Sequence, residues 1–195
     1  MNQISGAILA GGRSSRFGRD KALEVWQGKT LLEHAANSLE GCTERFIVGG
    51  NPERYGFLEI PVYPDLELFQ GSLHGLARAL EIAHHARVAV SACDTPNLTR
   101  NYWEFIANFV GDVVIPENSD GYLEPLAAMY SKNCLEYVKL ALEIGNLKMT
   151  GWFEGRDLQV RVVKWLELEQ LFQPSIFLNA NTPKDLAPGL ISEFP

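Results

Sequence analysis

Short apolar runs alternate along this chain with longer stretches in which apolar residues recur at three- and four-residue spacing. The apolar runs that predict buried strands are 7–10, 45–48, 61–63, 87–92, 112–115, 123–130 and 158–163. The stretches with helical spacing are 30–39, 73–84, 99–109 and 132–143. Strands that alternate with helices predict a mostly parallel sheet covered on both faces. The expected fold is therefore α/β, a three-layer α/β/α domain with a Rossmann-like sheet.

Chemically distinctive residues follow three of the predicted strands. A glycine- and arginine-rich loop follows the first strand, Asp65 follows the third, and Asp94 follows the fourth. In open parallel sheets, ligands bind at the carboxyl ends of the strands. The pattern therefore predicts one ligand site along a single edge of the sheet.

Composition limits the domain count and the class of partner. A chain of 195 residues with 46% hydrophobic and 21% charged residues is typical of one globular domain with a sizeable core. No repeat or interdomain linker interrupts it, so a single domain over 1–195 is expected. The net charge of −7 gives the chain no general attraction for nucleic acid.

Cysteine usage and the start of the chain indicate a compartment. Cys42, Cys93 and Cys134 are odd in number and far apart, so they form neither a disulfide framework nor a metal-ligand spacing. This favours a reducing environment. The sequence shows no secretory signal and no transmembrane stretch, so a cytoplasmic protein without a membrane partner is expected.

The segment GAILAGGRSSRFGRDK, residues 6–21, carries the strongest functional signal. Gly11 and Gly12 allow a tight turn and a close approach of backbone to a ligand. Arg13, Arg16 and Lys21 follow within reach of that turn. Backbone N–H groups and nearby cations together neutralise the oxygens of a polyphosphate. The segment therefore predicts a polyphosphate-binding loop.

Two common phosphate-binding motifs do not fit this loop. A Walker A loop requires G-x-x-x-x-G-K-[ST], but Gly12 and Gly18 are one residue too far apart and Arg19 follows Gly18. The dinucleotide motif G-x-G-x-x-G is also absent. Ser14 is better suited to bond phosphate here than to act as a nucleophile.

Asp94 is the candidate metal ligand. It follows the apolar strand 87–92 and precedes Pro96, which stops the strand ladder. Mg²⁺ prefers a few carboxylates together with substrate phosphate oxygens and water. Taken alone, Asp94 could equally cap the following turn. The phosphate loop at the start of the chain favours the metal interpretation.

Several motifs together resemble the molybdenum cofactor guanylyltransferase family of nucleotidyltransferases. The run L-A-G-G-x-S-x-R-F-G-x-D-K at 9–21 is similar to its signature, and C-D-T-P at 93–96 is similar to its metal motif. N-x-N-T-P-x-D-L at 179–186 matches its C-terminal motif. The resemblance implies a fold of the nucleotide-diphospho-sugar transferase type. It also implies transfer of GMP from GTP to molybdopterin, with Mg²⁺ as cofactor and pyrophosphate as product.

The resemblance also implies roles for individual residues. The implied catalytic residues are Arg16, Lys21 and Asp94, with Asp94 as the metal ligand. The implied nucleotide contacts are Leu9, Ala10, Gly11, Gly12, Ser14, Lys21, Asp65, Gly71, Gly75 and Asp94. The implied acceptor contacts are Glu124, Asn179 and Asn181.

The chain departs from the family pattern at two of these motifs. Ser72 stands in the G-P-L-x-G run where the family has Pro, and Glu124 stands where many relatives have His or Gln. Glu124 either orients an acceptor or solvates a strand end. Asp65 either accepts from base N–H groups or serves as a turn residue. Helix capping accounts for Thr182 without any ligand.

Three functional hypotheses remain open from the sequence. The first is guanylyl transfer to molybdopterin, which would involve cofactor-biosynthesis proteins and apo-molybdoenzymes as further partners. The second is a related transferase that uses CTP or a sugar-phosphate acceptor. The third is a non-catalytic nucleotide-binding protein that carries a cofactor. Lys21 and Asp94 together argue against this third hypothesis.

Overall fold

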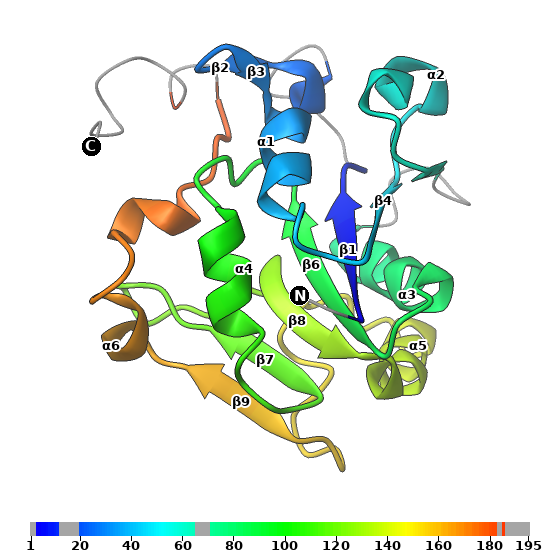
Figure 1. Ribbon diagram of the computed structural model, residues 1–195. Helices are drawn as coiled ribbons and strands as arrows, with labels where there is room; N and C mark the ends of the chain where they lie inside the picture. Colours follow the sequence, from blue (N-terminus) through cyan, green and yellow to red (C-terminus); the bar gives the residue numbers. More distant parts are fainter. Residues whose placement is uncertain (1–2, 12–19, 65–70, 183–184, 186–195) are drawn as a thin grey trace.

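A computed structural model describes residues 3–11, 20–64, 71–182 and 185 (Figure 1). Its centre is a seven-stranded sheet in the order β5-β4-β1-β6-β8-β7-β9. The strands are β1 (Ile4–Leu9), β4 (Glu44–Val48), β5 (Val62–Tyr63), β6 (Arg87–Ala92), β7 (Val113–Pro116), β8 (Ala127–Ser131) and β9 (Val160–Val163). Only β8 runs antiparallel to its neighbours, so the predicted mostly parallel α/β sheet is confirmed.

The remaining elements cover the sheet or extend from its edge. The α-helices are α1 (Leu31–Ser38), α2 (Pro52–Tyr55), α3 (Ser72–Ile82), α4 (Arg100–Ile106), α5 (Leu135–Glu143) and α6 (Trp165–Leu168). The 3-10 turns are η1 (Lys21–Leu23), η2 (Gly56–Leu58), η3 (Lys132–Cys134) and η4 (Pro174–Phe177). A separate antiparallel hairpin joins β2 (Val25–Trp26) to β3 (Lys29–Thr30).

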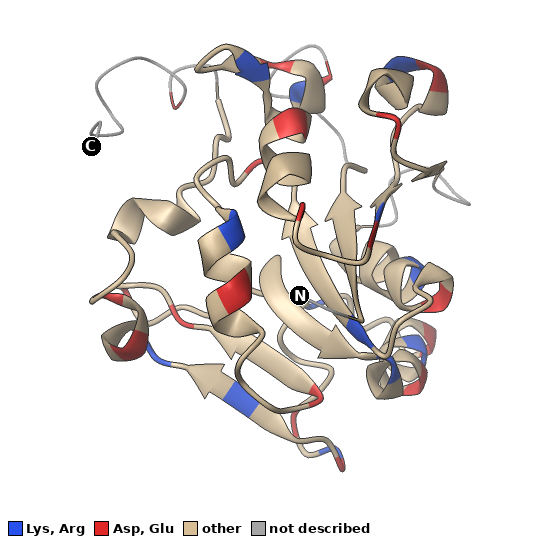
Figure 2. Cartoon of the chain, in the orientation of Figure 1, with Lys and Arg blue, Asp and Glu red and all other residues tan. Residues whose placement is uncertain are grey.

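Side chains alternate between the two faces of the sheet and build a core on each. In β1, Ile4 and Ile8 face the core beneath α1 and α4. Ala7 and Leu9 face the opposite core, which α3 and α5 cover. Figure 2 shows the charged residues chiefly on the helices and at strand ends, while the middle of the sheet is largely uncharged. The three-layer arrangement follows from this alternation.

The structure shortens several predicted elements. The strand predicted over 123–130 begins only at Ala127, because Pro125 lacks the N–H that a ladder requires. Leu123 forms an isolated bridge with Glu117 instead. The helix predicted to reach residue 84 ends at Ile82, and His84 hydrogen-bonds the Glu44 carboxylate.

Short elements without a long periodic pattern were not predicted. These are the β2–β3 hairpin, α2, α6, η1, η2 and η4. Within the described part of the chain, no helix has the length and apolar character needed to cross a membrane. A single nucleotidyltransferase domain over 1–195 stays a prediction.

Candidate active site

The candidate site lies at the carboxyl ends of β1 and β6, which pair side by side in parallel. From β1 the chain moves outward to β4 and β5, and it then returns to β6 on the other side of β1. This change of direction is the topological switch point where open α/β sheets bind ligands. Cys93 N donates to Leu9 O across the two strand ends, at 3.3 Å.

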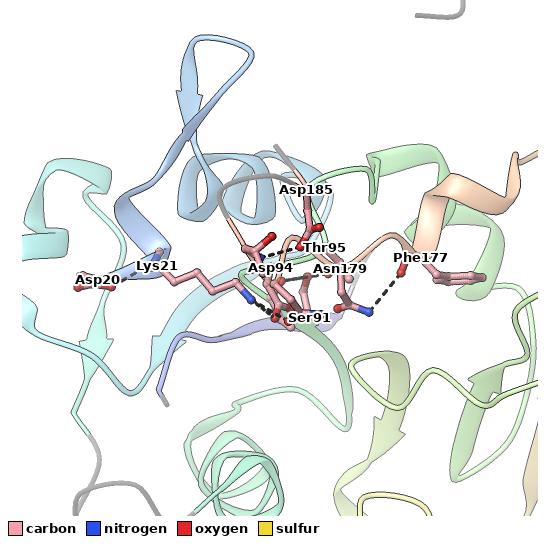
Figure 3. Close-up of polar contacts among 12 residues, drawn as sticks. Asp20, Lys21, Ser91, Asp94, Thr95, Phe177, Asn179 and Asp185 are labelled. Atoms are coloured by element: carbon pink, nitrogen blue, oxygen red, sulfur yellow. Dashed lines mark hydrogen bonds and ion pairs between the residues drawn. The ribbon is translucent and has the colours of Figure 1, made fainter. Parts of the chain in front are cut away.

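Lys21 joins the two motifs that the sequence singled out. Its Nζ lies 2.7 Å from Asp94 Oδ2 (Figure 3) and 3.2 Å from Asn181 Oδ1. The Lys21 and Asp94 side chains are 15% and 24% exposed, so this ion pair is only partly solvated. One ammonium group therefore connects the phosphate motif, the CDTP motif and the C-terminal motif.

The backbone holds the C-terminal motif against the end of β6. Ala180 N donates to Asp94 O at 2.8 Å, which fixes the Asn179–Asn181 segment beside the carboxylate. The two asparagines differ in what they contact. Asn181 bonds Lys21, whereas Asn179 Nδ2 donates locally to Phe177 O at 3.3 Å. Of the pair, Asn181 is the one whose side chain reaches the Lys21–Asp94 pair.

Thr182 and Asp185 are joined by the reciprocal half of the predicted capping interaction, while capping by the Thr182 hydroxyl stays a prediction. The Thr182 backbone N–H donates to Asp185 Oδ2 at 2.6 Å, and Asp185 N donates to Thr182 O at 3.0 Å. These bonds explain the two residues without a ligand.

Asp20 is a functional residue whose role the sequence interpretation missed. Its carboxylate accepts from Tyr55 Oη at 3.0 and 3.1 Å and from Ala22 N at 3.2 Å. Arg54 Nη1 lies 3.1 Å from Asp20 Oδ2. Asp20 thus caps η1 and links it to α2. These contacts fix the position of Lys21, which is the first residue of η1. An acidic residue directly before a short helical turn was the available signal.

Tyr55 is buried, and its hydroxyl lies against the Asp20 carboxylate. Burial, and then the charge of Asp20, raise the pKa of its phenol, so the hydroxyl remains a donor at neutral pH. Gly50 adopts φ +79°, and a Cβ there would lie 2.1 Å from the Tyr55 ring. Only glycine satisfies both the left-handed backbone and this close approach. Gly50, Tyr55 and Asp20 therefore form the support for Lys21.

The two glycines of the segment GSLHG, residues 71–75, shape the start of α3. Gly71 adopts φ +97° immediately before the helix. A Cβ on Gly75 would lie 3.2 Å from Leu9 Cδ1, so Gly75 lets α3 pack closely on β1. Leu9 is buried in the core below. Part of the motif is therefore explained by packing, while the exposed Gly71 and Gly11 keep their backbones accessible at the sheet edge.

Glu124 lies between the bridge residue Leu123 and β8, the strand that flanks β6 on the side away from β1. Its carboxyl is half-buried, and Asn118 Nδ2 donates to its Oε1 at 2.8 Å. Burial raises the pKa of Glu124, and the charge of Asp94 raises it further, while the Asn118 bond lowers it. The Asp94 contribution indicates that the two carboxyls share one electrostatic environment.

Cys93, Trp152 and Phe153 have structural roles. Burial raises the pKa of the Cys93 thiol to about 12, so it is no thiolate at neutral pH. Trp152 and Phe153 are buried in the core beneath α3 and α5.

Some predicted site residues lie outside the described part of the chain. They are Gly12, Ser14, Arg16 and Asp65. Their proposed contacts therefore stay predictions.

The described residues fit a metal that is held partly by its substrate. Asp94 Oδ2 and Asn181 Oδ1 converge on one cation position, which Lys21 Nζ occupies. Among the described residues no cluster of three or more His, Cys, Asp or Glu could hold a metal ion. Mg²⁺ commonly binds through one or two carboxylates together with substrate phosphates and waters. The family resemblance of the sequence implies such a divalent metal.

Comparison with known proteins assigns this arrangement to a family. Residues 6–159 match the family described as the MobA-like NTP transferase domain. The chain belongs to this family. The matched region includes Lys21, Asp94 and Glu124, so these residues of the site lie in an NTP transferase domain, whereas Asn179 and Asn181 lie beyond the match.

Relatives of this family align over nearly the whole chain. A protein of Carboxydothermus hydrogenoformans named probable molybdenum cofactor guanylyltransferase is 32% identical, covering 95% of this chain and 94% of its own. A molybdenum cofactor guanylyltransferase of Desulfosudis oleivorans is 33% identical with the same coverage. The chain is therefore related, along nearly its whole length, to proteins named molybdenum cofactor guanylyltransferase.

Solved structures show the same fold. The molybdopterin-guanine dinucleotide biosynthesis protein A of Archaeoglobus fulgidus superposes with a TM-score of 0.74 at 27% identity, covering 93% of this chain and 94% of that one. A 2-C-methyl-D-erythritol 4-phosphate cytidylyltransferase of Thermus thermophilus gives a TM-score of 0.68 at 18% identity, covering 93% and 94%. The second likeness concerns the fold alone.

The support beneath Lys21 can be tested with Tyr55→Phe. Loss of the phenol hydroxyl removes its bonds to Asp20, and we expect the free energy of unfolding to fall by about 1 kcal/mol. We also expect nucleotidyl transfer to slow, because η1 is held less firmly. Urea unfolding and turnover of the same preparation measure the two effects.

Tyr137→Phe is the matched control, since no hydrogen bond of its hydroxyl is found among the described residues. It is expected to leave both quantities unchanged. Equal stability and equal turnover for Tyr55→Phe and Tyr137→Phe would contradict the supporting role of Tyr55.

Proposed function

We propose that this nucleotidyltransferase transfers GMP from GTP to molybdopterin, in its free or molybdenum-loaded form. The products are molybdopterin guanine dinucleotide and pyrophosphate, and Mg²⁺ is the cofactor. The observation that carries the proposal is the meeting of Lys21, Asp94 and Asn181 at the switch point of the sheet. The relatives are named molybdenum cofactor guanylyltransferases. These names support guanylyl as the transferred group and the molybdenum cofactor as the acceptor.

The reaction needs little acid–base chemistry from the protein. The acceptor is a phosphate monoester, so its attacking oxygen is already anionic. This oxygen forms a bond to the α-phosphorus of GTP, and the bond from that phosphorus to the β-phosphate bridging oxygen breaks. Pyrophosphate leaves with the electron pair. Catalysis then depends on positioning and on neutralising charge.

Lys21 and Asp94 supply these effects in complementary ways. The Lys21 ammonium neutralises the Asp94 carboxylate. With GTP bound, Lys21 and Arg16 hold the triphosphate and the pyrophosphate leaving group. Asp94 is then free to hold Mg²⁺, which when bound neutralises charge at the reacting phosphate. Asn181 stays beside both groups through the bond of Ala180 N to Asp94 O.

The acceptor-side residues complete the proposed site. Glu124, Asn179 and Asn181 are proposed to bind the acceptor. The contacts of Lys21 with Asn181 and of Ala180 with Asp94 hold the segment that carries the two asparagines beside Asp94. Gly11, Gly12, Ser14, Asp65, Gly71 and Gly75 are proposed to contact the nucleotide, together with Leu9 and Ala10. Cofactor-biosynthesis proteins and apo-molybdoenzymes are proposed partners, and the cytoplasm is the proposed location.

A direct assay tests the choice of base and acceptor. The protein is incubated with molybdopterin, Mg²⁺ and each of GTP, CTP, ATP and UTP in turn, and the pterin dinucleotide is identified by mass spectrometry. We expect guanine dinucleotide from GTP alone, with one pyrophosphate released per product. Product from CTP and none from GTP would establish the cytidylyl alternative.

The same assay tests Lys21 and Asp94. We expect Lys21→Ala and Asp94→Ala each to lower turnover by about 10²-fold or more, by analogy with the loss of other transition-state donors. Asp94→Asn keeps the shape of the side chain and removes its charge, so the turnover of this variant should fall by a similar factor. Lys148→Ala, at an exposed position away from the site, is the control.

Each variant is checked by thermal unfolding, because loss of one partner leaves the other partly buried. Near-normal turnover by a folded Lys21 or Asp94 variant would remove that residue from the catalytic set. GTP binding without pyrophosphate release, with acceptor present, would instead support a nucleotide-binding carrier.

A further inference from the structure

One asparagine organises the loop between β7 and β8. Asn118 Oδ1 accepts from the backbone N–H groups of Asp120 and Tyr122, both at 3.0 Å. Its Nδ2 donates to Glu124 Oε1 at 2.8 Å. Gly121 N also donates to Asn118 O, at 3.0 Å. Asn118 therefore fixes the turn and the direction of the Glu124 carboxylate with a single side chain.

The sheet register brings this carboxylate to the same edge as Asp94. Ser91 of β6 pairs with Ala127 of β8, and Ala92 N donates to Leu126 O at 3.1 Å. Asp94 lies three residues after Ser91, and Glu124 lies three residues before Ala127. The two strands are antiparallel, so both carboxylates lie beyond the same end of the ladder.

Glu124 lies on the side of β6 that faces away from the glycine motif. The sheet order places β1 on one flank of β6 and β8 on the other. Gly71 and Gly75 belong to the start of α3, which packs on β1, β4 and β6. A nucleotide held by the phosphate loop and α3 occupies the β1 flank. The β8 flank, with Glu124, is left for the acceptor.

The chemistry of Glu124 limits what it can bind. An ionised carboxylate only accepts hydrogen bonds, and Asn118 uses one of its several acceptor positions. With Asp94 nearby, a further anion would be repelled, so an acceptor phosphate is a poor partner. Two adjacent N–H donors in one plane match a carboxylate well. The 2-amino-pyrimidin-4-one edge, which pterin and guanine share, presents that pair of donors.

We propose that Glu124, held in place by Asn118, binds the N–H edge of the pterin ring of the acceptor and thereby selects the acceptor. This inference rests on the proposed function. Glu124 is the specificity residue that touches the substrate, and Asn118 is a positioning residue that acts through it. The β8-flank location assigns the shared edge to pterin, whereas guanine would be read from the β1 flank.

Glu124→Gln tests the assignment. The substitution replaces one carboxylate oxygen with an amide NH₂ group. Both this group and the N–H edge of the pterin ring are donors, so they cannot form a hydrogen bond with each other. We expect the KM for molybdopterin to rise about tenfold or more, while the KM for GTP stays within about twofold. Asp120→Asn is the control, because it makes the same kind of change at an exposed position of the same turn. It should leave both KM values unchanged.

An exchange of the two side chains separates recognition from loop structure. Asn118→Asp places two carboxylates together and should lower the unfolding temperature and raise the acceptor KM. The double variant Asn118→Asp with Glu124→Gln restores a hydrogen bond of opposite polarity, so its unfolding temperature should recover. Its acceptor KM should stay high, because no carboxylate stands at position 124. Recovery of both quantities would show a purely structural role and overturn the inference.

The remaining outcomes are also decisive. If Glu124→Gln raises the KM for GTP instead, the carboxylate reads guanine and the acceptor assignment is wrong. If neither KM changes, Glu124 touches no substrate. If the unsubstituted protein forms no dinucleotide from GTP and molybdopterin, the proposed function fails and this inference fails with it. Normal product formation with an unchanged acceptor KM in Glu124→Gln defeats the inference alone.

Discussion

The contact between the Lys21 ammonium and the Asp94 carboxylate is the interaction on which the candidate site depends. It brings together residues 73 positions apart, and the Asn181 contact adds a segment 160 positions from Lys21. A partly buried carboxylate is costly unless a cation neutralises it. Lys21 supplies that cation. We propose that a divalent metal would take the same position if Lys21 bound a phosphate.

The fold provides both sides of this contact. Asp94 is fixed because β6 lies in the middle of the sheet, and its backbone carbonyl also bonds Ala180 N. Lys21 is fixed from the other side, because Asp20 caps η1 and accepts from the buried Tyr55 hydroxyl. A rigid strand end therefore faces a cationic turn held by a neighbouring helix. Such preorganised charge is what catalysis by electrostatic stabilisation requires.

Much of the fold could be predicted from the sequence because burial and periodicity determine it. The long helices and the central strands have clear apolar patterns, and the strand-end placement of Asp94 followed from them. Elements such as the β2–β3 hairpin, α2 and α6 were missed because pieces of two to four residues show no period. The role of Asp20 was missed for a different reason. It depends on Tyr55, which approaches only through a tertiary contact past Gly50.

A motif that carries its own chemistry let the sequence indicate individual residues, but not the contacts between them. The sequence indicated Lys21 and Asp94 separately, but only the structure shows that they touch. It also separates two asparagines that the motif treats alike, since Asn181 reaches Lys21 and Asn179 bonds Phe177 O. The Asn118–Glu124 bond could not be predicted from the sequence. Asparagines are common in turns, and the partner of this one lies six positions further along the chain.

A crystal structure with Mg²⁺ and a non-hydrolysable GTP analogue tests the central claim most directly. The account predicts that the metal binds Asp94 and that Lys21 Nζ has left the carboxylate for an oxygen of the triphosphate. The distance from Lys21 Nζ to Asp94 Oδ2 should then exceed hydrogen-bonding range, whereas the bond from Ala180 N to Asp94 O should persist. A metal bound elsewhere, with the Lys21–Asp94 ion pair intact beside a fully bound triphosphate, would contradict the account.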